Sequence, residues 1–170
     1  MKKIFLVLFS ILLLTGCATA PEANSQFSAA DLKFAEEMIP HHEQAILMSD
    51  IALTNSTSDE VLALARDIKA AQEPEVELMG SWQGVRTSTH MGHTMDGMLS
   101  EAEIQNLRDA EGATFDRLFH EGMIKHHEGA IKMAQKVLDS KNAEVATLAA
   151  AIIDAQEKEI AFMQELIKFY

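Results

Sequence analysis

The chain has 170 residues, a formal net charge of −12, three prolines and eight glycines. This length is sufficient for one domain with its own apolar core. The acidic balance argues against a nucleic-acid partner, because binding to phosphates requires a basic surface. Abundant Ala, Leu, Ile, Met, Glu and Lys, with little Pro and Gly, is typical of a helical protein.

The first residues predict a lipid-anchored export signal. Two lysines precede an apolar run that is too short to span a membrane and ends in "LTGC". This ending resembles a bacterial lipobox, which implies cleavage before Cys17 and lipidation of its thiol. We therefore expect residues 1–16 to be a signal peptide, 17–27 the lipidated Cys and a tether, and 28–170 the folded domain. As the only cysteine, Cys17 excludes an internal disulfide and a multi-thiolate metal site. The expected location is the cell envelope, and Ala18 favours the periplasmic side of the outer membrane if the cell is Gram-negative.

Capping residues divide the folded domain into helices. A Ser or Thr followed three residues later by an acid is a capping box, and Asn also caps helices. The caps are Ser28 with Asp31, Thr57 with Glu60, Ser100 with Glu103, and Asn142. The expected helices cover about 29–53, 57–82, 100–112, 115–139 and 142–170.

The two halves of the chain are near-copies. "EMIPHHEQAILM" at 37–48 is repeated as "GMIKHHEGAIKM" at 122–133, and identical residues continue to align in the helices that follow. We interpret the chain as two repeated helical hairpins, 28–82 and 113–168, joined by a long crossover over 84–112 that contains a short helix. One long crossover favours a ferritin-like four-helix bundle of the all-α class.

Each copy places one Met and two His within the apolar arc of its helix, at 100° per residue. Both copies retain these residues, whereas positions expected to be exposed differ, as at Gln44 and Gly129. Thioether and imidazole ligands without thiolates favour Cu(I). The candidate copper ligands in the helices are Met38, His41, His42, Met48, Met123, His126, His127 and Met133.

Polar residues of the neighbouring helices are expected in the same layer, because antiparallel packing brings them opposite the Met-His-His motifs. A buried carboxylate needs a hydrogen-bond partner or a cation. The supporting residues, as weaker ligands or as partners of the ligands, are His120, Glu43, Glu128, Gln72, Glu75, Gln156 and Glu159.

The crossover supplies a second group of candidate ligands. "THMGHTMDGM" at 89–98 is rich in glycine and has no core to fill, so its soft side chains indicate metal binding. These candidates are His90, Met91, His93, Met95 and Met98.

No catalytic constellation is recognised. The Glu-x-x-His signature of di-iron bundles is absent, as are Cys-x-x-Cys-His and any nucleophile motif. The sequence therefore favours binding over catalysis. Two alternatives remain: a metal-free interaction module whose His–Glu pairs specify the bundle and whose acidic surface meets a basic partner, and a redox enzyme at a paired metal centre.

Residues 28–168 resemble the bacterial family called domain of unknown function 305. The resemblance rests on "FAEEMIPHHEQAILMS" (34–49), "FDRLFHEGMIKHHEGAIKMA" (115–134) and the pair "AQEPEVELM" and "AQEKEIAFM". It implies a ferritin-like bundle that is secreted or lipid-anchored, and copper resistance as in those members that resemble periplasmic copper-binding proteins. The expected function is an envelope-anchored protein that sequesters or buffers Cu(I), with other copper-handling envelope proteins as partners.

Overall fold

The computed structural model describes residues 26–86 and 95–170. In this part the chain is helical, and the all-α prediction is confirmed. The helices are α1 (Ala29–Asn55), α2 (Asp59–Gly80), α3 (Glu101–Asp109), α4 (Gly112–Gln135) and α5 (Ala143–Leu166), followed by a 3₁₀ turn at Ile167–Phe169. No helix of the described ranges is long and apolar enough to cross a bilayer. The signal peptide, Cys17 and the crossover residues His90, Met91 and His93 lie outside the described residues.

The caps explain where the helices begin. Ser28 and Asp31 form the expected capping box at the start of α1, and Ser100 and Glu103 form another at α3. The box expected at Thr57 is wrong, because α2 begins one residue later with Ser58 as its N-cap. The Ser56 hydroxyl accepts a hydrogen bond from the Ser58 amide at 3.1 Å, which holds the turn in that register.

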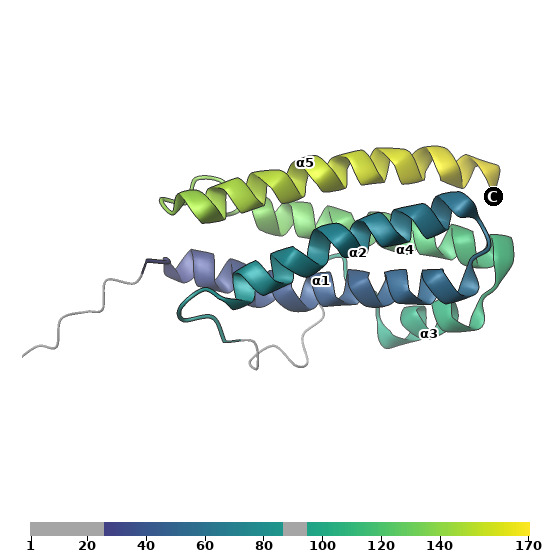
Figure 1. Cartoon of the computed structure of the whole chain (residues 1–170), viewed down its shortest axis with the longest axis horizontal. Helices are drawn as coiled ribbons and strands as arrows, with labels where there is room; N and C mark the ends of the chain where they lie inside the picture. The colour runs from purple at the N-terminus through teal and green to yellow at the C-terminus, as the bar shows by residue number, and fades with distance from the viewer. Residues whose placement is uncertain (1–25, 87–94) are drawn as a thin grey trace, which may run out of the picture.

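The four long helices lie side by side along the long axis of the molecule, with α3 beside α1 and α4 (Figure 1). α1 packs antiparallel to α2, and α4 packs antiparallel to α5. The two pairs meet through α1 and α4, which also run in opposite directions (Figure 1). The last described residues of the crossover before α3 lie on the α1–α4 side of the molecule, where Asp96 and Leu99 contact α1.

A layer of polar side chains divides the apolar core into two clusters. On α1, the first cluster extends to Ile39 and the second begins at Ala45, and on α4 the corresponding limits are Ala130 and Met123. The residues between these limits include fully buried histidines. The polar layer therefore crosses the middle of the molecule, and apolar packing on both sides shields it from water.

Two Ser–Asp hydrogen bonds fix the ends of the long helices. The Ser56 hydroxyl, in the α1–α2 turn, donates to buried Asp116 at the start of α4 at 2.5 Å. The Ser140 hydroxyl, in the α4–α5 turn, donates to Asp31 at the start of α1 at 2.7 Å. Asp31 has a further partner in the Ser28 amide at 2.7 Å. Each turn is thus tied to the N-terminal part of a helix in the other pair.

Replacing Ser56 with alanine is expected to lower the free energy of unfolding by about 1–3 kcal/mol, because the buried Asp116 carboxylate loses its hydrogen bond. The matched change Ser140→Ala should cost less, since Asp31 keeps the Ser28 amide. Urea unfolding followed by circular dichroism measures both. Equal losses in the two variants would contradict the assignment of Ser56 as the main partner of Asp116.

Candidate metal centre

The polar layer is built around four histidines. His41 and His42 come from α1, and His126 and His127 come from α4. All four side chains have 0 % exposure. The imidazoles of His41 and His126 meet across the α1–α4 contact, with ring centroids 3.8 Å apart. The structure therefore brings the two copies of the His-His motif, 85 residues apart in the sequence, into one cluster.

Largely buried carboxylates orient the second histidine of each pair. His42 donates from Nε2 to Glu75 of α2 at 2.9 Å, and His127 donates from Nε2 to Glu159 of α5 at 2.6 Å. A neutral imidazole with its proton on Nε2 carries a lone pair on Nδ1. Both Nδ1 atoms are buried and have no hydrogen-bond partner among the described residues. The carboxylates thus leave one metal-binding nitrogen free on each ring.

The first histidine of each pair is held differently. His41 donates from Nε2 to the backbone carbonyl of Asp96 at 3.1 Å, which leaves its buried Nδ1 without a partner in the described ranges. In His126 both ring nitrogens are buried and without a partner there. Orphaned buried polar atoms are uncommon and costly, so these nitrogens are candidates for a ligand that the protein fold alone does not supply.

Burial keeps these two rings neutral. It lowers the pKa of His41 to about 3, and proximity to His42 adds to this shift. Burial likewise lowers the pKa of His126 well below its ordinary value, with further contributions from His41 and His127. Protonating one ring would place a charge beside the others in an apolar setting. The uncharged imidazoles keep the lone pairs that a metal ion requires.

A thioether accompanies each histidine pair. Met38 and Met123 lie three residues before His41 and His126, about one helical turn away, and both have 0 % exposure. Of the other predicted ligands, Met133 packs in the first apolar cluster, two turns after His126. Met48 packs in the second cluster, and its methyl group lies 3.3 Å from where a Cβ at Gly122 would be.

The supporting residues separate into three groups. Gln72 and Gln156 are buried in the layer, and the side-chain oxygen of each lacks a partner among the described residues. Glu75 and Glu159 contact the histidines, as described above. Glu43 and Glu128 are exposed and do not enter the layer.

His120 lies apart from the four-histidine layer. It is also fully buried, but its ring stacks on Tyr170 with centroids 5.6 Å apart and meets Phe119 edge-on at 5.8 Å. Helical periodicity places it on the same stripe as Met123, yet its surroundings are those of the second apolar cluster. Burial lowers its pKa as well.

The donor set suits a soft ion. Among the described residues, no group of three His, Cys, Asp or Glu side chains is arranged to hold a metal ion. The two nearby carboxylates are engaged by Nε2 atoms, so the free donors are imidazole nitrogens and the thioethers of Met38 and Met123. Nitrogen and thioether donors suit Cu(I), whereas hard ions prefer oxygen. The residues present therefore fit copper by donor type.

Comparison with known proteins identifies the family. Residues 31–167 match the family model described as domain of unknown function (DUF305). The chain belongs to this family. Residues 1–18 match the prokaryotic membrane lipoprotein lipid attachment site, which supports an envelope-anchored location. No protein with a curated function shows significant sequence similarity to this DUF305 protein.

Solved structures share its fold. A putative secreted DUF305 protein from Streptomyces coelicolor is 30 % identical with a TM-score of 0.75, over 81 % of this chain and 91 % of that one. A DUF305 fragment from Deinococcus radiodurans is 30 % identical with a TM-score of 0.73, over 84 % and 98 %. CopM in its Cu(II)-bound form is 33 % identical with a TM-score of 0.72, over 82 % and 97 %. CopM has also been solved with Cu(I) and with Ag.

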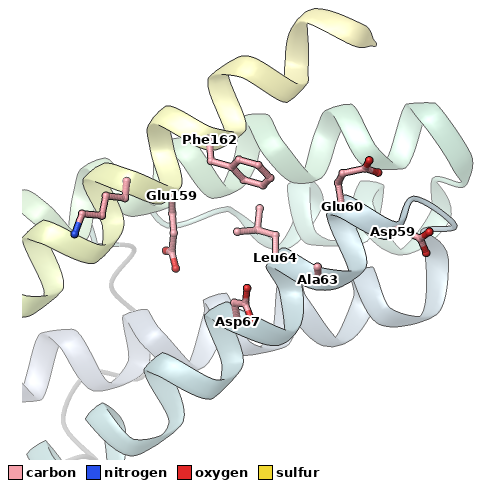
Figure 2. A pocket seen from close by; sticks show the side chains of 8 residues that line it. Asp59, Glu60, Ala63, Leu64, Asp67, Glu159 and Phe162 are labelled. Carbon is pink, nitrogen blue, oxygen red and sulfur yellow. The ribbon is translucent and has the colours of Figure 1, made fainter.

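In this DUF305 protein, a surface groove of about 550 Å³ between α2 and α5 reaches the histidine layer. Glu159 and Phe162 of α5 face Leu64 and Asp67 of α2 across it (Figure 2). The Glu159 side chain, 19 % exposed, lines the groove and accepts the hydrogen bond from His127. One carboxylate therefore separates solvent from a buried imidazole.

Sequence reasoning missed the contacts that the crossover makes with the layer. It identified Met95 and Met98, which are half-buried here, but not Asp96 between them. The contact depends on a backbone carbonyl, which no residue pattern encodes. The glycine within α4, at position 129, was a usable signal, because a glycine inside a helix often marks a close approach of another segment.

Proposed function

We propose that this protein binds Cu(I) in the cell envelope and thereby buffers or sequesters it. The observation that carries the proposal is a set of five buried ring nitrogens, on four histidines, that have no partner in the described part of the chain. They belong to two Met-His-His motifs that the fold brings into one layer. CopM, similar over most of both chains, has been solved with Cu(II), Cu(I) and Ag, which supports a copper cargo.

Six residues would hold the cargo within the helices: Met38, His41, His42, Met123, His126 and His127. Their nitrogen and sulfur atoms stabilise the monovalent state of copper, which prefers soft ligands and low coordination numbers. The apolar clusters on either side exclude water. The crossover residues Met95 and Met98, with His90, Met91 and His93, would offer a second binding region of the same chemistry.

The proposed function includes a cellular location but no chemical reaction. The lipid attachment site supports an anchor in the envelope, on the periplasmic side if the cell is Gram-negative. The acidic surface, with a net charge of −12, attracts cations to the protein without selecting among them. Selectivity would come from the buried layer. Partners would be envelope proteins that deliver or accept copper.

One observation also favours a second candidate, the metal-free interaction module. His42–Glu75 and His127–Glu159 are satisfied hydrogen-bonded pairs that link α1 to α2 and α4 to α5, as structural pairs would. Such pairs account for two ring nitrogens, but not for the five that remain without partners.

The test is a Cu(I) titration of the mature chain, residues 17–170, carrying Cys17→Ser to remove both the lipid and the thiol. Cu(I) is titrated against a competing chelator, with elemental analysis, and with Zn(II) and Fe(II) in parallel. Uptake of at least one tightly held Cu(I), in preference to the other two ions, is the expected result. Absence of tight Cu(I) uptake would overturn the proposal and favour the metal-free module.

A further inference from the structure

The end of the crossover lies directly on the backbone of α4. A Cβ atom at Gly129 would stand 2.0 Å from the Asp96 carbonyl oxygen. A Cβ at Gly97 would stand 2.6 Å from the Lys125 carbonyl oxygen, and Gly97 has a φ of +84°. A side chain at either position would therefore push the two segments apart. We call this contact of Asp96 and Gly97 with Gly129 the crossover seat.

Side chains on both central helices fasten the crossover at the seat. Lys132 of α4 pairs with the Asp96 carboxylate at 2.9 Å. Gln44 of α1 bonds both backbone groups of Leu99, donating at 2.9 Å and accepting at 2.8 Å. Gln44 and Gly129 are aligned in the repeat and were expected to be drifting exposed positions, which is wrong. Gly129 is buried and Gln44 half-buried, because both contact the crossover.

The seat sets the direction of one hydrogen bond in the histidine layer. A carbonyl oxygen accepts and never donates, so the Asp96 carbonyl requires the proton of His41 on Nε2. The His41 ring is neutral, and its buried Nδ1 then carries a lone pair with no partner in the described ranges. The Asp96 carbonyl accepts the Nε2 proton of His41, as the Glu75 carboxylate accepts that of His42, and each acceptor leaves Nδ1 without a proton.

We propose that Gly129 is a positioning residue for the metal centre. It allows the Asp96 carbonyl to approach α4, and this carbonyl fixes the tautomer and ring orientation of His41. The inference rests on the proposed function for its effect on metal affinity, but its effect on the ring does not require metal. It also gives the crossover a direct physical link to the buried layer, because displacing Asp96 releases His41.

The test compares Gly129→Ala with Gly122→Ala. Both changes replace a glycine of α4 that faces the crossover, and both raise helix propensity. A Cβ at Gly122 meets only the flexible ends of two side chains, Leu99 at 3.0 Å and Met48 at 3.3 Å, whereas one at Gly129 meets backbone. Long-range proton–nitrogen NMR of the metal-free protein reports the His41 tautomer, and competition titration reports Cu(I) affinity.

We expect Gly129→Ala to abolish the pure Nε2–H signature of His41 and to weaken Cu(I) binding about 10- to 100-fold, as loss of a partner of a metal-bound histidine does. Gly122→Ala should change neither. Lys132→Ala removes the ion pair with Asp96 and so loosens the seat without adding atoms. It should reduce the Nε2–H population of His41 and the Cu(I) affinity, each by less than Gly129→Ala does. Circular dichroism confirms that each variant remains helical.

The inference is overturned if the His41 tautomer is unchanged in Gly129→Ala, or if the tautomer changes while Cu(I) affinity equals that of Gly122→Ala. A wild-type protein that takes up no Cu(I) overturns the proposed function instead. In that case the NMR comparison still decides whether the seat orients His41.

Discussion

Replacing His41 and His126 together with alanine is expected to weaken Cu(I) binding by more than about 100-fold, because removing two ligands should cost more than removing one supporting partner. These two rings contact each other at the centre of the layer and supply three of its five unpartnered nitrogens. The change leaves His42–Glu75 and His127–Glu159 intact, so no buried charge is stranded. Chelator competition and elemental analysis measure the effect.

His120→Ala is the matched control for this prediction. His120 is also fully buried in α4 with both ring nitrogens lacking a partner among the described residues, but it lies outside the layer. It should therefore retain Cu(I) affinity within about threefold. The layer would lose its assigned role if the double variant bound Cu(I) as tightly as wild type. A strong loss in His120→Ala would instead move the binding site toward the second apolar cluster.

The histidine layer was predictable because its determinants are local. A helix repeats every 3.6 residues, so the spacing of Met38, His41 and His42 fixes which face of α1 they share. Counting back from the hairpin turn then predicts which α2 residues lie opposite them. This reasoning placed Glu75 in the same layer, where it contacts His42. The same reasoning placed Glu159 in the layer of the second motif, where it contacts His127. Helical periodicity and the short turn between paired helices were sufficient to place these residues in one layer.

The errors arose where tertiary contacts decide. Gln44 and Gly129 lie on the outer side of their helices by periodicity, and only the returning crossover covers them. His120 shares a helical stripe with Met123, but Tyr170, beyond the end of α5, stacks on its ring. The cap of α2 differs by one residue because Ser56 is already engaged with Asp116, a partner 60 residues away. No local pattern contains these partners.

The histidine layer also lowers the free energy of unfolding, and the apolar clusters on either side of it compensate for this loss. Orphaned nitrogens oppose folding, whereas the apolar clusters on both sides favour it. A metal ion that satisfies those nitrogens would bind the folded state alone and stabilise it, by about 2.7 kcal/mol at a concentration 100 times its Kd. Unfolding measured with and without metal would therefore report binding independently of any chelator.

Acid is expected to destabilise the metal-free protein well above the range where carboxylates titrate. The folded-state pKa of His41 is about 3, whereas its ordinary value is 6.5. Between these values the unfolded chain binds a proton that the folded protein does not, so stability is complete above pH 6.5 and falls as the pH decreases toward 3. The expected slope is about 1.4 kcal/mol per pH unit for this histidine.

His126 contributes in the same direction, since burial lowers its pKa too. Urea unfolding of metal-free protein at pH 6.5, 5.5 and 4.5 measures the slope in a window above the ordinary pKa of Asp and Glu. The variant His41→Gln with His126→Gln, which keeps polar side chains but cannot titrate, should flatten it. A wild-type slope no steeper than that of this variant would show that the two rings gain protons in the folded protein. That result would require an open layer that water enters, in place of one sealed by the two apolar clusters.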